Sequence, residues 1–392
     1  MAQRPPLDAA GEPYDVMNRR VAQQFREREH LSGEAAARSR HAVRILLFVL
    51  ITFSTWWLLG CSGSSGDEAG DGAPRNTAAT KAKLDRKRIL DLLTSVPAWD
   101  AATRQGRQRA AEHVASLYDG IAFTGLFEPP AGPPGRQVAV FRDENLRIDL
   151  VLVPGCVDEE PATRRSSNRG TTADTSIAAS SSAGPLLLSR TEIPQRVWTH
   201  VTGANPSRFR GSDRPVESVS WETARSVAAE AGYRFPTRDE WTRARGEVPD
   251  SDDPQVMGNH ADEARLRALA EDMPLEDALK KVTPGYDDGF AETADVAQFR
   301  PNEWGLFDML GNVWEWCEDY DRSLSSDPAA LDAAAAQGYR VGRALRGGSW
   351  LMRLNIAKEE DELHFPTTGV SSQIGVCLAR SVDVATAITK SD

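Results

Sequence analysis

Apolar residues recur at helical spacing in two stretches that follow the first 80 residues of the chain. The apolar positions are Leu84, Ile89, Leu92 and Leu93 in the first stretch and Ala110, Val114 and Leu117 in the second. Residues three and four apart lie on the same face of a helix, so each stretch has one face that can pack against a core. The pattern predicts a helical segment over residues 81–120.

Two later helices have start and stop signals as well as an apolar face. Ser220 is placed to cap the first of them and Gly232 to end it. The apolar positions of that helix are Trp221, Ala224, Val227, Ala228 and Ala231. In the stretch "FPTRDEWTRARG", Thr237 and Glu240 form a capping-box pattern, and Gly246 ends the second helix. Both helices are expected to place a tryptophan against a core.

Other stretches predict a strand, a break and a segment without a core. The stretch "LRIDLVLVPG", residues 146–155, has the apolar run of a buried strand. The prolines and glycines of residues 129–135 break the chain before it. Residues 159–184 hold almost no large apolar side chain. Such a segment cannot bury enough surface to order itself, so we expect a disordered insertion there.

The N-terminus has the pattern of an export signal rather than of a folded domain. Residues 1–44 form a polar, arginine-rich leader with eight arginines and six acids, and residues 45–60 are sixteen uncharged residues that end before Cys61. A positive flank, an apolar segment and small residues after it are typical of a segment that directs export. The protein is therefore expected in the cell envelope, outside the cytoplasm and attached to a membrane.

Cys61 leaves two modes of membrane attachment open. The residues "LLGC" resemble the lipobox of bacterial lipoproteins, which implies cleavage before Cys61 and lipidation of its thiol. The alternative is an uncleaved transmembrane anchor, because residues 45–66 lack charge and about 20 apolar residues span a bilayer. In both cases the Gly-, Ser- and Ala-rich residues 62–80 form a flexible linker to the folded part.

The overall composition excludes one class of function and locates the core. The 392-residue chain has a net charge of −11, which argues against a nucleic-acid-binding protein, because such proteins present a basic surface. Seven of the ten tryptophans fall between Trp198 and Trp350. We expect the organised core in that part of the chain.

Seven motifs, in order along the chain, resemble one family of proteins. They are "NPSRF", "PVESVSW", "FPTRDEW", "YDDGF", "PNEWGLFDMLGNVWEW", "LRGGSW" and "IGVCLAR". They resemble the formylglycine-generating enzyme, or sulfatase-modifying factor, family over residues 138–380, which leaves residues 381–392 as a tail. The resemblance implies an α+β fold that is irregular, loop-rich and similar to that of C-type lectins.

The resemblance also implies two structural calcium sites. The matching ligands of the first site are the side chains of Asp308 and Glu315 and the carbonyl groups of Gly311 and Val313. Those of the second site are the side chains of Asn259 and Asp288 and the carbonyl groups of His260 and Phe290. Ca²⁺ takes about six to eight oxygen ligands in adaptable geometry, which loops of this composition supply. The alternative is that these groups only hydrogen-bond their own loops.

At the catalytic position of the family this chain departs from the pattern. Members that oxidise a sulfatase cysteine to formylglycine bind copper through two cysteines that follow "GGS". Met352 and Ala357 stand at the matching positions here. A copper(I) oxidase of this kind needs soft thiolate ligands, and the thioether of Met352 is a much weaker donor, so copper is not expected. Ser349 then has no reaction to serve and is expected to hydrogen-bond its loop.

Three further cysteines follow Cys61. Cys156, Cys317 and Cys377 do not have the spacing of metal ligands. Cys317 and Cys377 come directly after core motifs, so we expect buried thiols. A structural disulfide is the alternative outside the cytoplasm.

Three functions remain open on these observations. The first is a non-catalytic, membrane-anchored module that binds a protein, peptide or glycan, and the missing copper cysteines favour it because fold and function separate readily. The second is an enzyme of the formylglycine-generating (protein cysteine oxidase) family, or another oxidative enzyme with a divergent site. The third is a structural component of the envelope.

Overall fold

The structure is a computed structural model that describes residues 77–156, 184–251, 253–321, 331, 341–355 and 362–383. The predicted leader, the apolar segment with Cys61, nearly all of the predicted insertion and Ala357 lie outside these ranges. Within them, helices and antiparallel strands are mixed in irregular order, which confirms an α+β fold. No helix among the described residues is long and apolar enough to cross a membrane.

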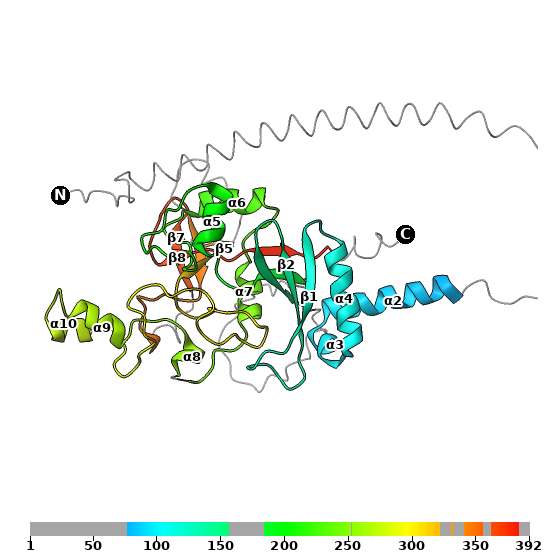
Figure 1. Ribbon diagram of the computed structural model, residues 1–392, viewed down its shortest axis with the longest axis horizontal. Coiled ribbons are helices and arrows are strands. Elements are labelled where there is room, and N and C mark those ends of the chain that lie inside the picture. The colour runs from blue at the N-terminus through cyan, green and yellow to red at the C-terminus, as the bar shows by residue number, and fades with distance from the viewer. Residues whose placement is uncertain are drawn as a thin grey trace, which may run out of the picture.

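The described part begins with three helices within or near the predicted helical segment, and the first of them starts at Thr77, inside the predicted linker 62–80. They are α2 (Thr77–Thr94), α3 (Val96–Ala101) and α4 (Arg104–Ser116). Ser95 and Thr103 cap α3 and α4, because their side-chain oxygens accept from the backbone N–H groups of Ala98 and Gly106. Trp99 of α3 is fully buried and donates its indole N–H to the carbonyl of Gln137 at 2.8 Å. This contact fixes the helices to the sheet beside them (Figure 1).

A five-stranded antiparallel sheet forms one half of the core. Its order is β1-β2-β3-β4-β9, with bounds β1 (Ile121–Phe127), β2 (Val138–Asp143), β3 (Ile148–Val153), β4 (Leu186–Ser189) and β9 (Ala379–Ser381). β3 confirms the predicted strand, and the Pro- and Gly-rich residues 129–135 connect β1 to β2. The three inner strands are apolar on both faces and almost wholly buried, as expected for a sheet covered on both sides.

A second, four-stranded sheet has the order β7-β6-β5-β8. Its strands are β5 (Trp314–Tyr320), β6 (Gly342–Arg346), β7 (Glu362–Pro366) and β8 (Ile374–Gly375). β8 runs parallel to β5, and the other pairs are antiparallel. Residues 376–378 lead directly from β8 to β9 of the first sheet and are buried. The two sheets are therefore joined through one short core segment.

Three helices pack around these sheets, and two of them begin as the sequence predicts. They are α5 (Gln195–Thr202), α6 (Trp221–Glu230) and α7 (Arg238–Arg245). Ser220 caps α6 by accepting from the N–H of Thr223, and Thr237 and Glu240 form the predicted capping box of α7. Trp241 of α7 is fully buried, whereas Trp221 of α6 is only half-buried.

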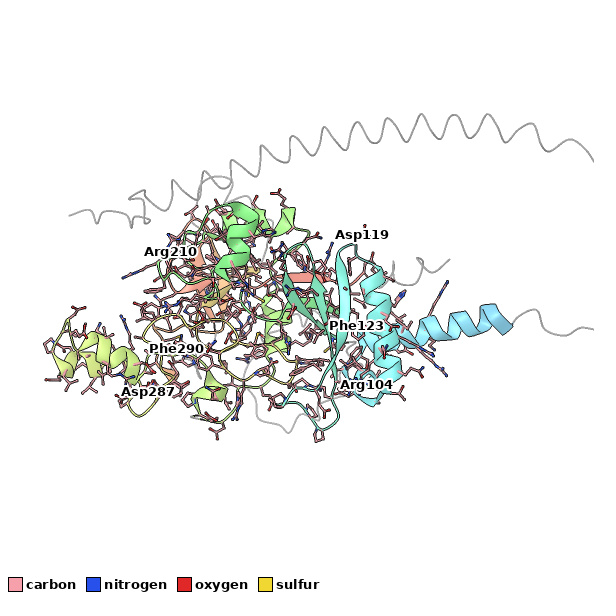
Figure 2. The ribbon with its side chains drawn as sticks, in the orientation of Figure 1. Arg104, Asp119, Phe123, Arg210, Asp287 and Phe290 are labelled. Atoms are coloured by element: carbon pink, nitrogen blue, oxygen red, sulfur yellow. The ribbon has the colours of Figure 1, made fainter. Side chains whose placement is uncertain are left out.

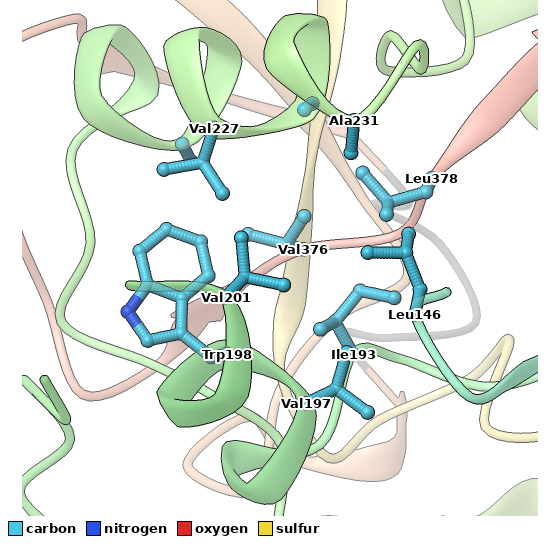
Figure 3. Close-up of a pocket in the computed structure, with 11 residues that line it drawn as sticks. Leu146, Ile193, Val197, Trp198, Val201, Val227, Ala231, Val376 and Leu378 are labelled. Carbon is cyan, nitrogen blue, oxygen red and sulfur yellow. The ribbon is translucent and has the colours of Figure 1, made fainter. Parts of the chain in front are cut away.

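α5 and α6 enclose a small gap in the core. The gap has a volume of about 20 Å³ and is lined only by apolar residues, among them Trp198, Val227 and Val376 (Figure 3). This volume is close to that of a single water, and the lining offers a water no hydrogen-bond partner except the Trp198 indole. The gap is a packing defect and is too small for a ligand.

A pair of short helices projects from the body at the end opposite α2 (Figure 1). They are α9 (Glu263–Leu269) and α10 (Leu275–Leu279), and α8 (Pro254–Met257) precedes them. Ala261, Leu269, Ala278 and Val282 form a small core of their own between them. This pair is inserted between the two halves of the second predicted calcium site, His260 and Asp288.

Candidate functional site

The stretch "GLFDMLGNVWEW" is a loop of unusual backbone that leads into β5. Asp308, Gly311 and Asn312 have positive φ angles of 57°, 77° and 55°. At Gly311 any side chain would collide with backbone, because a Cβ there would lie 2.1 Å from the carbonyl oxygen of Asn259. Glycine is the residue that tolerates both the angle and the contact. The mixture of glycine and polar residues in this stretch therefore serves a close approach of two loops.

The contact at Gly311 joins the two predicted calcium loops. Asn259 and Gly311 form a parallel β-bridge, and Asn312 donates its backbone N–H to the Asn259 carbonyl at 2.8 Å. The Asn259 side-chain amide donates to Asn312 Oδ1 at 3.1 Å. The structure thus brings the start of the second predicted site next to the centre of the first.

Glu192, which the sequence did not point to, holds the same loop from behind. Its carboxylate accepts from the side-chain amide of Asn312 at 2.6 Å and from the backbone N–H of Val313 at 3.0 Å. Glu192 is fully buried, and its pKa is raised well above the ordinary value by burial and by the nearby carboxylates of Asp308 and Glu315. It lies about 120 residues earlier in the chain, so its role follows from tertiary contacts alone.

The two side-chain ligands predicted for the first site are buried carboxylates. Asp308 Oδ2 accepts from the N–H of Ala297 at 2.6 Å, whereas Asp308 Oδ1 is buried without a hydrogen-bond partner among the described residues. Glu315 accepts from the indole N–H of Trp241. Burial raises the pKa of Asp308, and burial is also the main cause that raises the pKa of Glu315 to about 8. A bound cation would satisfy this unpartnered oxygen and would reduce the repulsion between the neighbouring carboxylates.

The second predicted site also has one buried oxygen that accepts no hydrogen bond from the described residues. Asn259 Oδ1 is buried without a hydrogen-bond partner in the described part of the chain. Asp288 accepts from the backbone N–H groups of His260 at 2.8 Å and Phe290 at 2.9 Å. The imidazole Nε2 of His260 lies 2.9 Å from the Met257 carbonyl, so the ring points into the core. This orientation agrees with a role for the His260 backbone alone.

Asp262 is a second residue that the sequence did not point to. One of its oxygens accepts from the N–H of Asp288 at 2.7 Å and the other accepts from the N–H of Arg265 at 2.9 Å. Asp262 is fully buried at the start of α9. Burial, with Asp262 as a neighbouring charge, raises the pKa of Asp288 above its ordinary value. The insertion that carries α9 and α10 is therefore fixed to the second loop by this carboxylate.

The donor set in both loops suits a hard cation better than a soft one. Within the described ranges no three or more His, Cys, Asp or Glu side chains gather closely enough to hold a metal ion by themselves. A bound ion would need backbone carbonyl oxygens in addition to the carboxylate and amide oxygens. Ca²⁺ accepts such mixed oxygen ligands, and thiolate-preferring metals do not.

The segment after β6 is held by hydrogen bonds to the segment before β8. Ser349 is fully buried and donates to Gln373 Oε1 at 3.0 Å, which confirms its predicted role in the loop. Trp350 donates its indole N–H to the Ser372 carbonyl at 3.1 Å. Met352 is half-buried, packs against the main core and accepts the N–H of Ala261 on its carbonyl at 2.9 Å.

The three described cysteines are free thiols and form no disulfide with one another. Cys317 and Cys377 are 0% and 1% exposed, which confirms the predicted buried thiols. Burial raises the pKa of both well above the ordinary value. Cys156 is half-buried and lies in an isolated bridge with Ser95. Neither buried thiol is therefore available as a thiolate at neutral pH.

A cavity of about 800 Å³ borders the loop of the first predicted calcium site, and Asp308, Met309 and Leu310 of that loop line it. Its apolar wall includes Phe299, Leu306, Met309 and Leu310. Charged side chains at the cavity come from Arg245, Glu247, Arg300, Glu303 and Asp308. Cavities of this volume hold small molecules or single side chains of a bound peptide. None of its lining residues belongs to the segment Ser349–Met352.

Residues 155–382, more than half of the chain, match the family model described as "Sulfatase-modifying factor enzyme 1-like domain". The chain belongs to this family. The match confirms the resemblance drawn from the seven motifs. It begins after β3, so β1 to β3 and the N-terminal helices precede the matched residues.

Relatives in this family carry different names. The chain is 30% identical to the formylglycine-generating enzyme of Thermomonospora curvata over 168 residues, which are 41% of this chain and 52% of that protein. It is 26% identical to the chaperone protein LppX of Paenibacillus barcinonensis over 274 residues, which are 59% of this chain and 89% of that protein. It is 31% identical to inactive C-alpha-formylglycine-generating enzyme 2 of Mus musculus over 161 residues, which are 41% of this chain and 45% of that protein.

The chain spans about half the length of the formylglycine-generating enzymes that it matches, 52% and 50% in two bacterial examples. Among solved structures, PvdO from Pseudomonas aeruginosa is similar with a TM-score of 0.40 and 19% identity. That similarity covers 62% of this chain and 97% of PvdO.

Proposed function

We propose that this protein is a membrane-tethered, non-catalytic member of the sulfatase-modifying factor family that binds a protein, peptide or glycan. The observation that carries the proposal is the residue at position 352. The resemblance places a copper-binding cysteine there, and this chain has Met352, which packs against the core. A thioether is a far weaker ligand for this role than a thiolate, and Ala357 at the second position has no ligand atom.

The remaining thiols do not replace the missing pair. Cys317 and Cys377 lie inside the core with raised pKa values, and a cysteine binds a metal as the thiolate rather than the thiol. The residues present therefore do not fit a copper site of the family kind, and no oxidative step is assigned to them.

The names of two relatives support a binding role. One is an enzyme of this family designated inactive, and another is designated a chaperone. A chaperone acts by binding another protein, so this family fold serves functions other than oxidation. In the present chain the 800 Å³ cavity, with an apolar wall and charges of both signs, is the surface that we assign to such a ligand.

An oxidative enzyme is the second candidate function. It is favoured by 30% and 34% identity to the formylglycine-generating enzymes of Thermomonospora curvata and Streptomyces coelicolor. Formation of formylglycine separates the two candidates directly.

We expect the purified protein to make no formylglycine. Loaded with copper under reducing conditions and given a sulfatase-type peptide, it should bind no Cu(I) tightly and produce no aldehyde, because Met352 and Ala357 supply no thiolate. Peptide mass spectrometry and a Cu(I) competition assay measure the two results. The double variant Met352→Cys with Ala357→Cys should gain Cu(I) affinity and serves as the positive control for the metal assay. Aldehyde formation by the unaltered chain would overturn the non-catalytic function.

We place the protein in the cell envelope, tethered through residues 45–61. The sequence supports this position, since an apolar segment ends before Cys61 and a Gly-, Ser- and Ala-rich stretch follows it. Of the two modes of attachment we favour lipidation, because it explains why a cysteine comes directly after "LLG".

We expect the mature chain to begin at a lipidated Cys61. The Cys61→Ser variant should retain its leader, because the thiol that receives the lipid is gone and processing is blocked. Intact mass spectrometry of membrane-extracted protein measures both results. An unmodified Cys61 in the wild type would exclude the lipoprotein and leave the uncleaved anchor.

We also propose that calcium occupies both loops and holds them together. Asp308 and Glu315 would bind it with Gly311 and Val313 carbonyls at one site, and Asn259 and Asp288 with His260 and Phe290 carbonyls at the other. The unpartnered oxygens Asp308 Oδ1 and Asn259 Oδ1 support the assignment. Calcium supplies positive charge to loops whose buried carboxylates otherwise repel one another.

A further inference from the structure

The N-terminal helical end of the molecule is basic although the protein as a whole is acidic. Residues 77–109 carry eight Lys and Arg residues against three acids, in a chain whose net charge is −11. Among the side chains that the structure describes at this end, the exposed cations are Lys87 and Arg88 on α2 and Arg104 and Arg109 on α4. We call these four residues the basic end. Figure 2 shows Arg104 at this end, opposite the loop that carries Asp287 and Phe290.

The four cations form no ion pairs within the described part of the fold. None of them pairs with a carboxylate among the described residues. Arg107 differs, because it is buried and donates to the carbonyls of Trp99 and Asp100. Exposed like charges without partners repel one another, so they favour an anionic surface that approaches from outside.

Two of these cations line a groove between α2 and α4. The groove has a volume of about 680 Å³, and Arg88 and Arg109 lie along it with Ile89 and Leu92 as its apolar part. The N-terminus of α4 also borders it through Thr103, Gln105 and Gly106. Because the N-terminal end of a helix carries partial positive charge, it adds to the field of the two guanidinium groups. Asp91 lines the groove as well and weakens that field without cancelling it.

The position of the basic end along the chain indicates that a membrane surface is its binding partner. Sixteen residues, 61–76, separate the apolar segment from the first residue of α2. A Gly- and Ser-rich stretch of that length has an average end-to-end span of about 20–24 Å, which would keep α2 close to the surface in which the apolar segment is held. Basic segments beside a membrane anchor bind anionic headgroups, and each Lys or Arg strengthens the contact about fivefold.

We infer that the basic end of α2 and α4 rests on anionic phospholipid headgroups, with a headgroup phosphate in the groove between Arg88 and Arg109. This inference rests on the proposed tether through residues 45–61. The contact orients the domain: α9 and α10 then lie on the side away from the bilayer, because α2 and α10 are at opposite ends of the molecule (Figure 1). The tether and the basic end together form a two-point attachment.

The test compares the full-length protein in vesicles of phosphatidylcholine with the protein in vesicles that also contain phosphatidylglycerol. Flotation measures attachment, and hydrogen exchange of α2 and α4 amides measures contact. With the anionic lipid we expect exchange in these helices to slow at least fivefold, because binding the folded helices stabilises them by mass action. The double variant Arg88→Gln with Arg109→Gln should lose this slowing, as should the wild type at high salt.

Lys280→Gln with Lys281→Gln, directly after α10, is the matched control, since it removes two exposed charges at the other end and should leave the slowing unchanged. If the protein floats with both kinds of vesicle but hydrogen exchange in α2 and α4 is equally fast with and without the anionic lipid, the inference is wrong and the tether stands. If the tether itself fails, the protein should float only with phosphatidylglycerol vesicles, and the arginine double variant should not float. Absence of flotation with either vesicle would then refute both ideas.

Discussion

Calcium is expected to raise the melting temperature of the protein, and the variants Asp308→Ala and Glu315→Ala should lose most of that gain. A ligand that binds only the folded state stabilises it by about 2.7 kcal/mol at a hundred times its Kd. In a domain of this size that corresponds to about 5–10 °C. The physical reason is the buried Asp308 Oδ1, which has no hydrogen-bond partner among the described residues until a cation reaches it.

Thermal unfolding with calcium and with chelator measures this effect. Asp295→Ala is a suitable control, because Asp295 is an exposed acid in the neighbouring segment and should leave the calcium gain unchanged. A melting temperature that is the same in calcium and in chelator would refute the calcium assignment.

The pH dependence of stability gives a second readout of the same site. Burial raises the pKa of folded Glu315 to about 8, and the pKa of an unfolded Glu is about 4.3. Between these values the folded state binds more protons than the unfolded state, so the free energy of unfolding decreases as the pH rises. In chelator the protein should melt lower at about pH 8 than at about pH 5.5, and calcium should reduce this difference by stabilising the ionised carboxylates.

Gly311→Ala is expected to destabilise the protein by about 4 kcal/mol or more, which is exceptional for one methyl group. A Cβ at this position would lie 2.1 Å from the carbonyl oxygen and 2.8 Å from the carbonyl carbon of Asn259. These are backbone atoms, held by the bridge between Asn259 and Gly311, and they cannot rotate away as a side chain would. The loops must separate, and the hydrogen bond from Asn312 to Asn259 breaks with them.

Gly203→Ala provides the matched control for this prediction. Gly203 follows α5 with a φ of 73°, close to the 77° of Gly311, but nothing lies within 4 Å of a Cβ placed there. Its substitution should cost only about 1–2 kcal/mol, which is the price of the left-handed conformation alone. Urea unfolding of both variants measures the difference. Equal losses would show that backbone conformation, and not the contact with Asn259, decides stability at Gly311.

Local patterns in the sequence were sufficient for the elements whose signals lie within a few residues of one another. The caps at Ser220 and Thr237 are examples, because the hydrogen bonds that start these helices join residues three positions apart. The apolar run of β3 is another. The family also followed from the sequence, since its motifs are long and occur in a fixed order, and the match over residues 155–382 confirms it.

The short helices α9 and α10 show where local patterns failed. Their apolar positions are few, and each helix has only seven or five residues. A helix that short is not stable by its own propensity, so it forms because its few apolar side chains pack together. Leu269 and Ala278 pack together in a small core with Ala261 and Val282, and these four residues do not recur at a regular helical spacing. No periodic signal marks such a pair in advance.

The sequence by itself determined the family, the start of α6 and α7, the burial of Cys317 and Cys377 and the residue types at the loop Asp308–Glu315. Only the tertiary structure decided that this loop pairs with Asn259, and that Glu192 and Asp262 hold the two loops in place. The physical reason is the range of the interactions. Caps and apolar periodicity depend on interactions between neighbours in the chain. The role of a buried carboxylate depends on hydrogen-bond donors that folding brings to it from up to 121 residues away.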